Sequence, residues 1–317
     1  MNVSVVIPTY NMANTLPRAI ESVLKQTLQD FSVIVVDDAS TDMTAEVVRK
    51  YDDPRIVYVR HETNRGGSAA VETGIVKSSA PLIAGLDADD VVRPDWLKVL
   101  SRTFAEPSVG MAWGGIALRR EDGTLYSMAV RSPWDTDEPA SPMPVMLTWT
   151  PGAGGVMYRK AMLDQVGFLD PEISMGDLEF SIRLASSGKW KVRVVPEIVM
   201  DVYRRPGSLS GKVDSHYFAS LERILDKHAG LWEEHPDACA YYHYRAARAA
   251  FELGQVKAGF GHLDRAVEAE PANRKYRWYR LIRRLRLQSI WHGLSYLRAK
   301  TDEKRRMKKL EARERES

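Results

Sequence analysis

The sequence predicts an α/β fold in the first two hundred residues, followed by an all-helical region. Short apolar runs alternate with segments whose apolar residues recur at helical spacing, the pattern of a mainly parallel sheet flanked by helices. Strand patterns cease after residue 213. Because 317 residues exceed the size at which a single core stops growing, we expect more than one part.

The expected strands of the parallel half, at 3–8, 31–37, 56–60 and 82–87, are rich in Val and Ile. Helices are expected between and after them at 16–24, 45–51, 69–76 and 94–106. Further along we expect strands at 109–118, 191–195 and 198–203, a turn at 121–123, an exposed proline-rich loop at 132–144, and helices at 160–166 and 177–187. We therefore place an α/β domain at residues 1–210, a helical region at 211–273 and a tail at 274–317.

Composition limits the class of protein. Hydrophobic residues make up 44% and charged residues 27% of the chain, which predicts a folded domain and not a disordered one. No apolar run reaches the roughly 18 uncharged residues of a membrane-spanning helix, and the first residues lack the features of an export signal. The single cysteine, Cys239, excludes an internal disulfide and favours a cytoplasmic location.

Polar clusters follow three of the four expected parallel strands, at residues 9–11, 37–38 and 87–90. In such sheets ligands bind at the carboxyl ends of the strands, so we expect all three clusters to face one crevice. Asp87 and Asp89, separated by one residue, can share a divalent cation with phosphate oxygens. Asp90 fits equally well as a cap of the next helix, and Asp42 is expected to cap its own helix, whereas Asp37 is expected to contact the ligand.

Five motifs together resemble glycosyltransferase family 2, the inverting nucleotide-sugar enzymes of the GT-A fold. They are VSVVIPTYN at 3–11, VVDDASTD at 35–42, NRGGSAA at 64–70, GLDADD at 85–90 and MGDLEF at 175–180. The resemblance covers residues 1–210 in family order and at family-like spacing. It is therefore far more specific than any one motif.

The resemblance implies a role for each matching position. Asp89 would be the direct ligand of Mn²⁺ or Mg²⁺, with Asp87 beside it facing the ribose or diphosphate, and Asp177 would be the catalytic carboxylate. The positions implied to bind the nucleotide-sugar donor, most simply a UDP-sugar, are Pro8, Thr9, Tyr10, Asn11, Asp37, Asp38, Asn64, Gly66, Asp87 and Ala88.

The expected chemistry needs these residue types. Inverting transfer is a single displacement in which the acceptor hydroxyl loses a proton as it attacks, so a carboxylate such as Asp177 suits the base. A cation would stabilise the charge that grows on the departing nucleoside diphosphate. The structural alternative for Asp177 is a helix N-cap, and Glu179 is expected to be a solvated or packing neighbour and not a second base.

The chain departs from the family pattern at two places. Val71 and Glu72 stand where many relatives carry Arg-Asn, which removes a cation that could pair with the diphosphate; Arg65 or Lys77 are candidates to replace it. A histidine frequent in the late Tyr-Arg motif is also missing, because Pro206 takes its place.

Three other features lie near these departures. Arg204 and Arg205, beside Pro206, could grip phosphate directly. The glycine-rich run at 152–155 lacks the next glycine of a dinucleotide fingerprint, so we interpret it as flexible backbone beside the acceptor. Trp149 fits a sugar-stacking residue and a core aromatic equally well.

The helical region contains a pattern similar to one tetratricopeptide unit at 240–273, which a plain helical hairpin explains equally well. A single unit cannot bury its own face, so we expect it to pack on 213–229 or on a protein partner. The residues at the expected small, aromatic, turn and stop positions are Ala247, Ala250, Phe251, Gly254, Ala266 and Pro271.

The tail carries 16 Lys and Arg against 5 Asp and Glu, a balance of +11, so the first 273 residues carry about −8. Its arginines alternate with Tyr, Trp, Leu and Ile, which is typical of a helix lying on an anionic bilayer. A packed, solvated helical extension is the equal alternative. Nucleic acid is not an expected partner, since the body is acidic and no recognition motif is present.

The expected function is metal-dependent transfer of a sugar, from a UDP-sugar in the first instance, to a hydroxyl of a glycan or lipid-linked glycan in polysaccharide biosynthesis. The expected location is cytoplasmic, with the tail on the inner face of the membrane. An alternative from another class is a scaffold with a decayed catalytic domain, acting through its helical region. A nucleotidyltransferase is a third alternative, but residues 8–11 lack the glycine-rich phosphate loop it would need.

Overall fold

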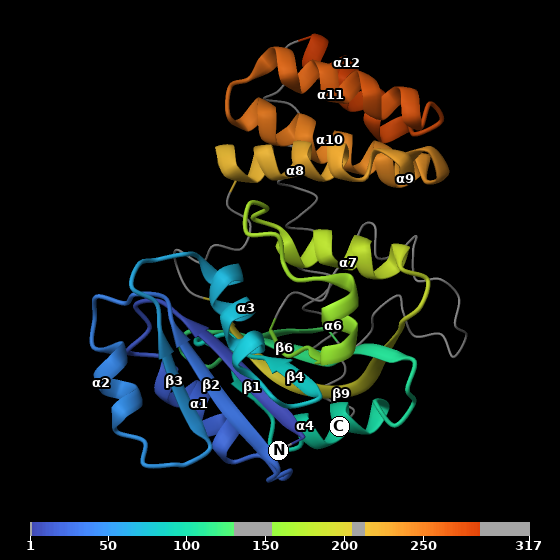
Figure 1. Cartoon of the computed structure of the whole chain (residues 1–317). Coiled ribbons are helices and arrows are strands. Elements are labelled where there is room, and N and C mark those ends of the chain that lie inside the picture. Colours follow the sequence, from blue (N-terminus) through green and yellow to red (C-terminus); the bar gives the residue numbers. More distant parts are fainter. Residues whose placement is uncertain (1, 130–153, 205–212, 286–317) are drawn as a thin grey trace, which may run out of the picture. The chain divides into compact units, whose positions relative to one another are not determined.

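The structure is a computed structural model that describes residues 2–129, 154–204 and 213–285. The chain divides into two compact units, Met1–Ser208 and Leu209–Ser317. All described strands belong to the first unit, and the described elements of the second are helices (Figure 1). The α/β class followed by an all-helical extension is thus confirmed.

The first unit is built on one mixed sheet, whose described strands lie in the order β3-β2-β1-β4-β8-β6-β9-β5, with β7 beside β6. The four predicted parallel strands are confirmed as β1 (Val3–Thr9), β2 (Phe31–Asp37), β3 (Ile56–Arg60) and β4 (Leu82–Gly85). Strand β4 ends two residues earlier than predicted, so Asp87 lies in the loop that follows it.

The other half of the sheet contains β5 (Val91–Val92), β6 (Val109–Arg120), β7 (Leu125–Ala129), β8 (Met157–Arg159) and β9 (Lys191–Arg204). Strand β8 pairs antiparallel with β4 and β6, and β6 runs parallel to β9. The two predicted strands at 191–195 and 198–203 form the single strand β9. Its register against β6 shifts around Pro196, where a residue without an N–H is tolerated.

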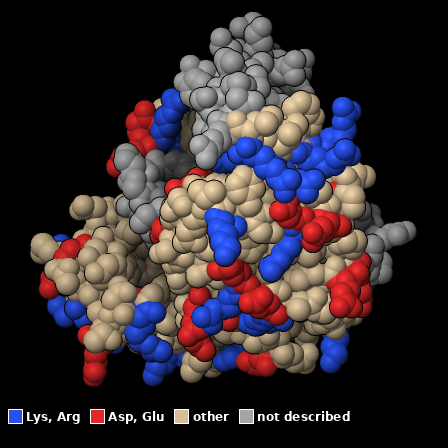
Figure 2. Space-filling view, turned by 90° about the horizontal axis from the view of Figure 1, so that it is seen from above, with Lys and Arg blue, Asp and Glu red and all other residues tan. Residues whose placement is uncertain are grey.

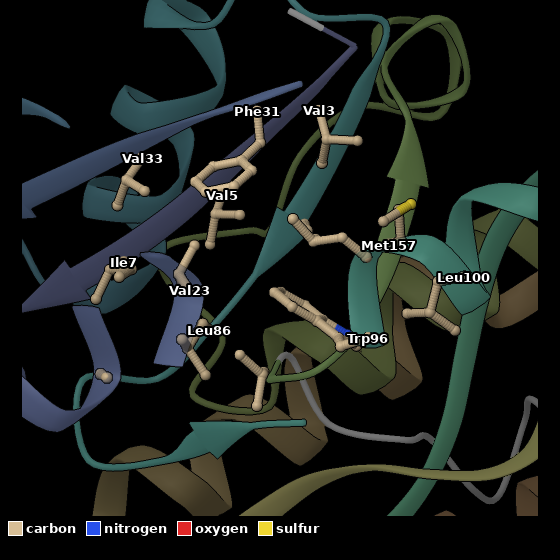
Figure 3. Close-up of a cluster of buried hydrophobic side chains, with 14 of the residues drawn as sticks. Val3, Val5, Ile7, Val23, Phe31, Val33, Leu86, Trp96, Leu100 and Met157 are labelled. Carbon is tan, nitrogen blue, oxygen red and sulfur yellow. The ribbon is translucent and has the colours of Figure 1, made fainter. Parts of the chain in front are cut away.

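Helices cover both faces of the sheet. The alternation along β1 directs Val5 and Ile7 to one face, where α1 (Leu16–Leu24), α2 (Thr44–Arg49) and α4 (Trp96–Thr103) pack. The indole of Trp96 lies in this core, and its ring nitrogen donates a hydrogen bond to the carbonyl of Gly155 (Figure 3). Val6 points to the other face, toward α3 (Gly67–Lys77), α6 (Lys160–Val166) and α7 (Gly176–Ser186).

The second unit contains α8 (Ser215–Lys227), α9 (Ala229–Glu234), α10 (Pro236–Glu252), α11 (Val256–Ala269) and α12 (Arg274–Arg284). Helices α10 and α11 form a hairpin whose turn contains Gly254 at a φ of 74°. Gly259 lets α11 approach the ring of Phe251, because a Cβ there would lie 2.7 Å from it. Helix α8 packs on α10, as expected. That the hairpin is a tetratricopeptide unit stays a prediction.

No helix in the described parts of the chain is long and apolar enough to cross a membrane. Cys239, on α10, is half-buried, and burial raises the pKa of its thiol.

Candidate active site

Strands β1 and β2 end side by side, with Thr9 in register with Asp37. Beyond them Asn11 adopts a φ of 53° and fastens the next loop: its side-chain oxygen accepts hydrogen bonds from the amides of Thr41 at 2.7 Å and Asp42 at 3.3 Å. The Tyr10 side chain is 44% exposed. Among the residues predicted to contact the donor, the Asn11 side chain is therefore used in hydrogen bonds within the protein, and Tyr10 is exposed.

The carboxylate of Asp37 is fully buried at the end of β2. It accepts hydrogen bonds from the amide of Ser40 at 2.7 Å, from the Tyr58 hydroxyl, and from Arg60 at 3.0 Å. A buried charge needs such partners to remain stable. Burial and Asp37 together raise the pKa of Tyr58. Asp37 is thus held rigidly where a nucleoside is expected.

Asp38 anchors the loop between β3 and α3. Its carboxylate meets the His61 ring nitrogen at 2.6 Å and accepts from the amides of Arg65 at 2.9 Å and Gly66 at 2.7 Å. The Asn64 side chain donates to the Asp38 carbonyl at 3.2 Å. The structure therefore brings these predicted donor residues together, but the polar groups of Asp38 and Asn64 are used in hydrogen bonds within the protein.

The buried hydroxyl of Thr9 has no hydrogen-bond partner among the described residues. A buried polar atom without a partner costs free energy, about 1–3 kcal/mol. This orphaned oxygen, beside the end of β2, fits a site that a polar ligand completes.

The acidic turn after β4 gathers three carboxylates. Solvent reaches the Asp87 side chain, but an apolar pocket lined by Val71, Tyr158 and Phe180 adjoins it and limits its hydration. That loss of hydration, followed by the negative charges of Asp89 and Asp177, raises the pKa of Asp87 to about 6. Asp177 therefore lies near the acidic turn, although 90 residues separate it from Asp87 in the sequence.

Asp90 points away from the ligand side. It is buried and accepts a hydrogen bond from the amide of Tyr203 in β9 at 3.0 Å. Burial, and then the charge of Asp87, raises its pKa to about 8. The alternative that Asp90 caps the next helix is wrong, because Asp95 occupies the N-cap of α4. Asp90 instead ties the acidic turn to β9.

Arg18 of α1 holds the same turn from the opposite side. Its guanidinium donates a hydrogen bond to the carbonyl of Asp89 and lies over the ring of Tyr203, 3.7 Å from the ring centre. Sequence reasoning missed this residue, because an arginine between the apolar positions of a helix gives the pattern of an ordinary solvated face. Its partners lie about 70 and 185 residues further along the chain.

Asp177 lies in the first turn of α7. Its carboxylate accepts a hydrogen bond from the amide of Leu178 at 2.9 Å. The N-cap alternative is wrong, since Met175 occupies that position. A negative charge is favourable at a helix N-terminus, so α7 helps to keep Asp177 ionised. Burial, Asp177 and Asp87 together raise the pKa of Tyr158, which places this tyrosine beside both carboxylates.

Glu179 is fully buried and not solvated. Arg183 binds both of its oxygens, at 3.0 and 2.9 Å, and also donates to the carbonyls of Val166 and Phe168. Glu179 is therefore a packing neighbour, which was one of its two predicted environments. Through Arg183 it fixes the segment before α7.

Two other predicted features are resolved by the described residues. Asp42 accepts hydrogen bonds from the amide of Thr44 at 3.0 Å and the amide of Ala13 at 3.0 Å, so it holds the start of α2, but its predicted place as the cap is wrong because Met43 occupies the N-cap. The backbone of Gly154 passes so close to Asp87 that a Cβ there would lie 2.9 Å from a carboxylate oxygen.

Of the proposed replacements for the missing cation, Lys77 lies at the far end of α3 from Gly66, about 15 Å along the helix. Arg65 lies at the near end and is exposed. The predictions for Trp149, Gly152, Arg205 and Pro206, for the Arg204 side chain and for the loop at 132–144 lie outside the described residues.

The described residues contain no group of three or more His, Cys, Asp or Glu side chains arranged to hold a metal ion. The acidic turn still fits one, because Mg²⁺ commonly binds through one or two carboxylates and completes its shell with substrate phosphates and water. The mutual repulsion that raises the pKa of Asp87 is what a cation would relieve.

A family model described as Glycosyl transferase family 2 matches residues 4–167, just over half of the chain. The chain belongs to glycosyltransferase family 2. An uncharacterized glycosyltransferase of Nostoc sp. (strain PCC 7120) is 32% identical over 179 residues, which cover 54% of this chain and 55% of that protein. The match thus spans about half the length of this family 2 relative.

Two solved structures share the fold. The crystal structure of S. aureus TarS 1-349 in complex with UDP-GlcNAc aligns with a TM-score of 0.66 at 21% identity, covering 85% of this chain and 81% of that one. The mannosyltransferase PcManGT from Pyrobaculum calidifontis, in complex with GDP-Man and Mn²⁺, aligns with a TM-score of 0.54 at 20% identity, covering 89% and 83%. At this identity the two structures show that this chain shares their fold.

Proposed function

We propose that this protein transfers a sugar from a nucleoside-diphosphate sugar, with a divalent cation, to a hydroxyl acceptor with inversion at the anomeric carbon. One observation carries the proposal. Asp87, which follows β4, lines one pocket with Phe180 of α7, the helix whose first turn holds Asp177, so carboxylates from two distant parts of the chain lie near the carboxyl edge of the parallel strands.

The donor would lie across the ends of β1, β2 and β4. The orphaned hydroxyl of Thr9 and the rigidly held Asp37 supply polar atoms for a base and ribose. UDP is the proposed nucleotide, supported by the UDP-GlcNAc complex of TarS, which has the same fold. GDP is the second nucleotide to test, because PcManGT, which also has this fold, forms a complex with GDP-Man.

Asp89, with Asp87 beside it, would hold Mn²⁺ or Mg²⁺ against the diphosphate. The bound cation would stabilise the negative charge that develops on the leaving nucleoside diphosphate. Arg18 keeps the Asp89 backbone in place, and Asp90 fastens the turn to β9, so the ligands stay positioned between turnovers.

Asp177 would take the proton from the attacking hydroxyl. Its place at the start of α7 favours its ionised form, and its closeness to Asp87 puts it on the donor side of the crevice. Tyr158 lines the same pocket as Asp87 and lies near Asp177 as well.

The proposed acceptor is a glycan or lipid-linked glycan of polysaccharide biosynthesis. Membership of family 2 supports the glycan, and Asp177 supports the hydroxyl. The proposed location is cytoplasmic, at the inner face of the membrane, with the lone Cys239 in keeping with a reducing compartment. The hairpin of α10 and α11 is the proposed contact for any protein partner.

The test is a screen of UDP- and GDP-sugars with Mn²⁺, Mg²⁺ or chelator, followed by sugar release and transfer assays. Asp89→Ala is expected to lose metal-supported donor binding. Asp177→Asn is expected to keep donor binding and lose transfer by about 10²-fold or more. Asp95→Asn, which removes an exposed carboxylate from the same segment, is the matched control and is expected to behave as wild type.

Two outcomes would count against the proposal. If Asp89→Ala and Asp177→Asn both turn over normally, these residues do not form the site. If the wild-type protein binds none of the nucleotide sugars, the result supports the alternative function, a scaffold with a decayed catalytic domain.

A further inference from the structure

Helix α12 has two different faces. Tyr276 and Tyr279 are buried, and their ring centres lie 5.0 and 5.4 Å from that of Tyr244 on α10. On the other face, Trp278 is 56% and Leu281 46% exposed, three residues apart, and thus neighbours on the helix surface. The helix is therefore a packed extension that still presents large apolar side chains to solvent.

Leu285, directly after α12, continues this exposed row and is 57% exposed. Three exposed large apolar side chains in one row mark an interaction surface, because isolated exposure is common but a contiguous patch is not. We call Trp278, Leu281 and Leu285, with the arginines around them, the outer face of α12.

Positive charge surrounds this row. Residues 274–285 contain six Lys and Arg and no acidic residue. Arg274 and Arg277 form no ion pair with another described residue, while Arg280 and Arg284 reach Asp264 at 3.2 and 3.3 Å. These four arginines line one groove together with Trp278 and Leu281. Figure 2, a view from above, shows Lys and Arg side chains gathered over part of the surface.

We propose that the outer face of α12 docks on an anionic lipid surface. Trp278 suits the interface between headgroups and acyl chains, Leu281 and Leu285 suit shallow insertion, and the arginines suit lipid phosphates. A protein partner is the competing occupant, because Trp and Arg also gather at protein interfaces. The six Lys and Arg of residues 274–285, without one acidic residue, favour an extended anionic surface instead. This docking goes beyond sugar transfer and does not depend on it.

The test is co-sedimentation of the full chain with large vesicles of phosphatidylcholine alone, or with about one third phosphatidylglycerol, at about 0.1 M salt. The wild type is expected to bind the anionic vesicles only, and to leave them at high salt. Arg274→Gln with Arg277→Gln is expected to weaken binding roughly 10- to 30-fold, at about fivefold for each charge. Trp278→Ser with Leu281→Ser is expected to weaken binding through lost insertion.

Two variants control for charge and for apolar exposure. Arg49→Gln with Lys50→Gln removes the same charge from α2, and Val256→Ser removes an apolar side chain that is 56% exposed on α11. Both are expected to bind like wild type. Circular dichroism checks that all variants fold.

The proposal is overturned if the outer-face variants bind as tightly as the controls, or if neutral and anionic vesicles bind equally. It is also overturned if the chain ignores vesicles and forms a Trp278-dependent dimer in size-exclusion chromatography, since a second copy would then cover the face. Transfer to a water-soluble acceptor should be unchanged in every α12 variant, so failure of docking remains distinct from failure of catalysis.

Discussion

Replacing Gly154 by alanine would place one methyl group against the acidic turn. The new Cβ would lie 2.9 Å from a carboxylate oxygen of Asp87, where ordinary contacts begin near 3.4 Å. The Asp87 side chain can rotate, so relief comes from movement of the carboxylate and not of the backbone. The fold should therefore survive while the proposed donor site changes.

The required shift is about half an ångström or more, taken from the difference between these two distances. Misplacement of a positioned group by about 1 Å can cost about 10²-fold in rate. We therefore expect kcat/KM to fall roughly 10- to 100-fold in Gly154→Ala, with a higher Mn²⁺ or Mg²⁺ concentration needed for half-maximal activity. The midpoint of urea unfolding should move little.

The assay is initial-rate sugar transfer across a metal titration, together with urea unfolding followed by circular dichroism. Gly261→Ala on α11 is the matched control, because nothing lies within 4 Å of its new Cβ. Wild-type kcat/KM and metal dependence in Gly154→Ala would refute the reasoning. A large loss of stability would also refute it, since the backbone would then have given way in place of Asp87.

Three further changes test other contacts. Arg18→Met removes the hydrogen bond to the Asp89 carbonyl and should lower metal-supported kcat/KM about tenfold. An unchanged metal titration would show that the acidic turn keeps its conformation without Arg18. Arg183→Met leaves the fully buried Glu179 without its cation and should cost about 3–5 kcal/mol in urea unfolding; a cost under about 1 kcal/mol would contradict this. Burial, and then the charges of His262 and Arg265, lower the pKa of His243 to about 4. Between pH 6.5 and pH 4 this histidine is therefore protonated in the unfolded chain but not in the folded chain. The free energy of unfolding should be at its full value above pH 6.5 and fall by up to about 3 kcal/mol toward pH 4. Thermal unfolding from pH 8 to 4.5 measures this loss of stability, which should be smaller in His243→Gln. If the variant and the wild type show the same pH profile, His243 is not its cause.

The parallel half of the sheet could be predicted from sequence because each strand is an uninterrupted buried run bounded by turn residues. Strands β5, β7 and β8 could not, since they are two to five residues long. Moreover, β5 and β8 pair with strands that are distant in the sequence, whereas β7 forms a hairpin with β6. The helix at 94–106 proved shorter, at Trp96–Thr103, because Pro94 and Asp95 lie before its first turn.

The acidic residues of the site could be found from sequence, but their division of labour could not. Asp87 and Asp90 differ by three positions in one turn, yet one faces solvent and the other binds the amide of Tyr203. Arg18 carried no signal, and Gly154 was noticed only as part of a glycine-rich run predicted to be flexible, because their importance comes from a carbonyl contact and a close approach that only the folded chain creates. The roles of Thr9 and Asp37 in donor binding, of Asp89 as metal ligand and of Asp177 as catalytic carboxylate remain predictions.

Helix α3 begins at the crevice, where many nucleotide-binding folds seat a phosphate on the free amides of a helix N-terminus. Here Asp38 already occupies the amides of Arg65 and Gly66 with its own carboxylate. This built-in anion takes two amides just ahead of the helix, and Val71 adds no positive charge in the first turns. If a diphosphate binds at this edge of the sheet, as proposed, the negative charge of Asp38 near α3 increases the benefit of a cation at the acidic turn.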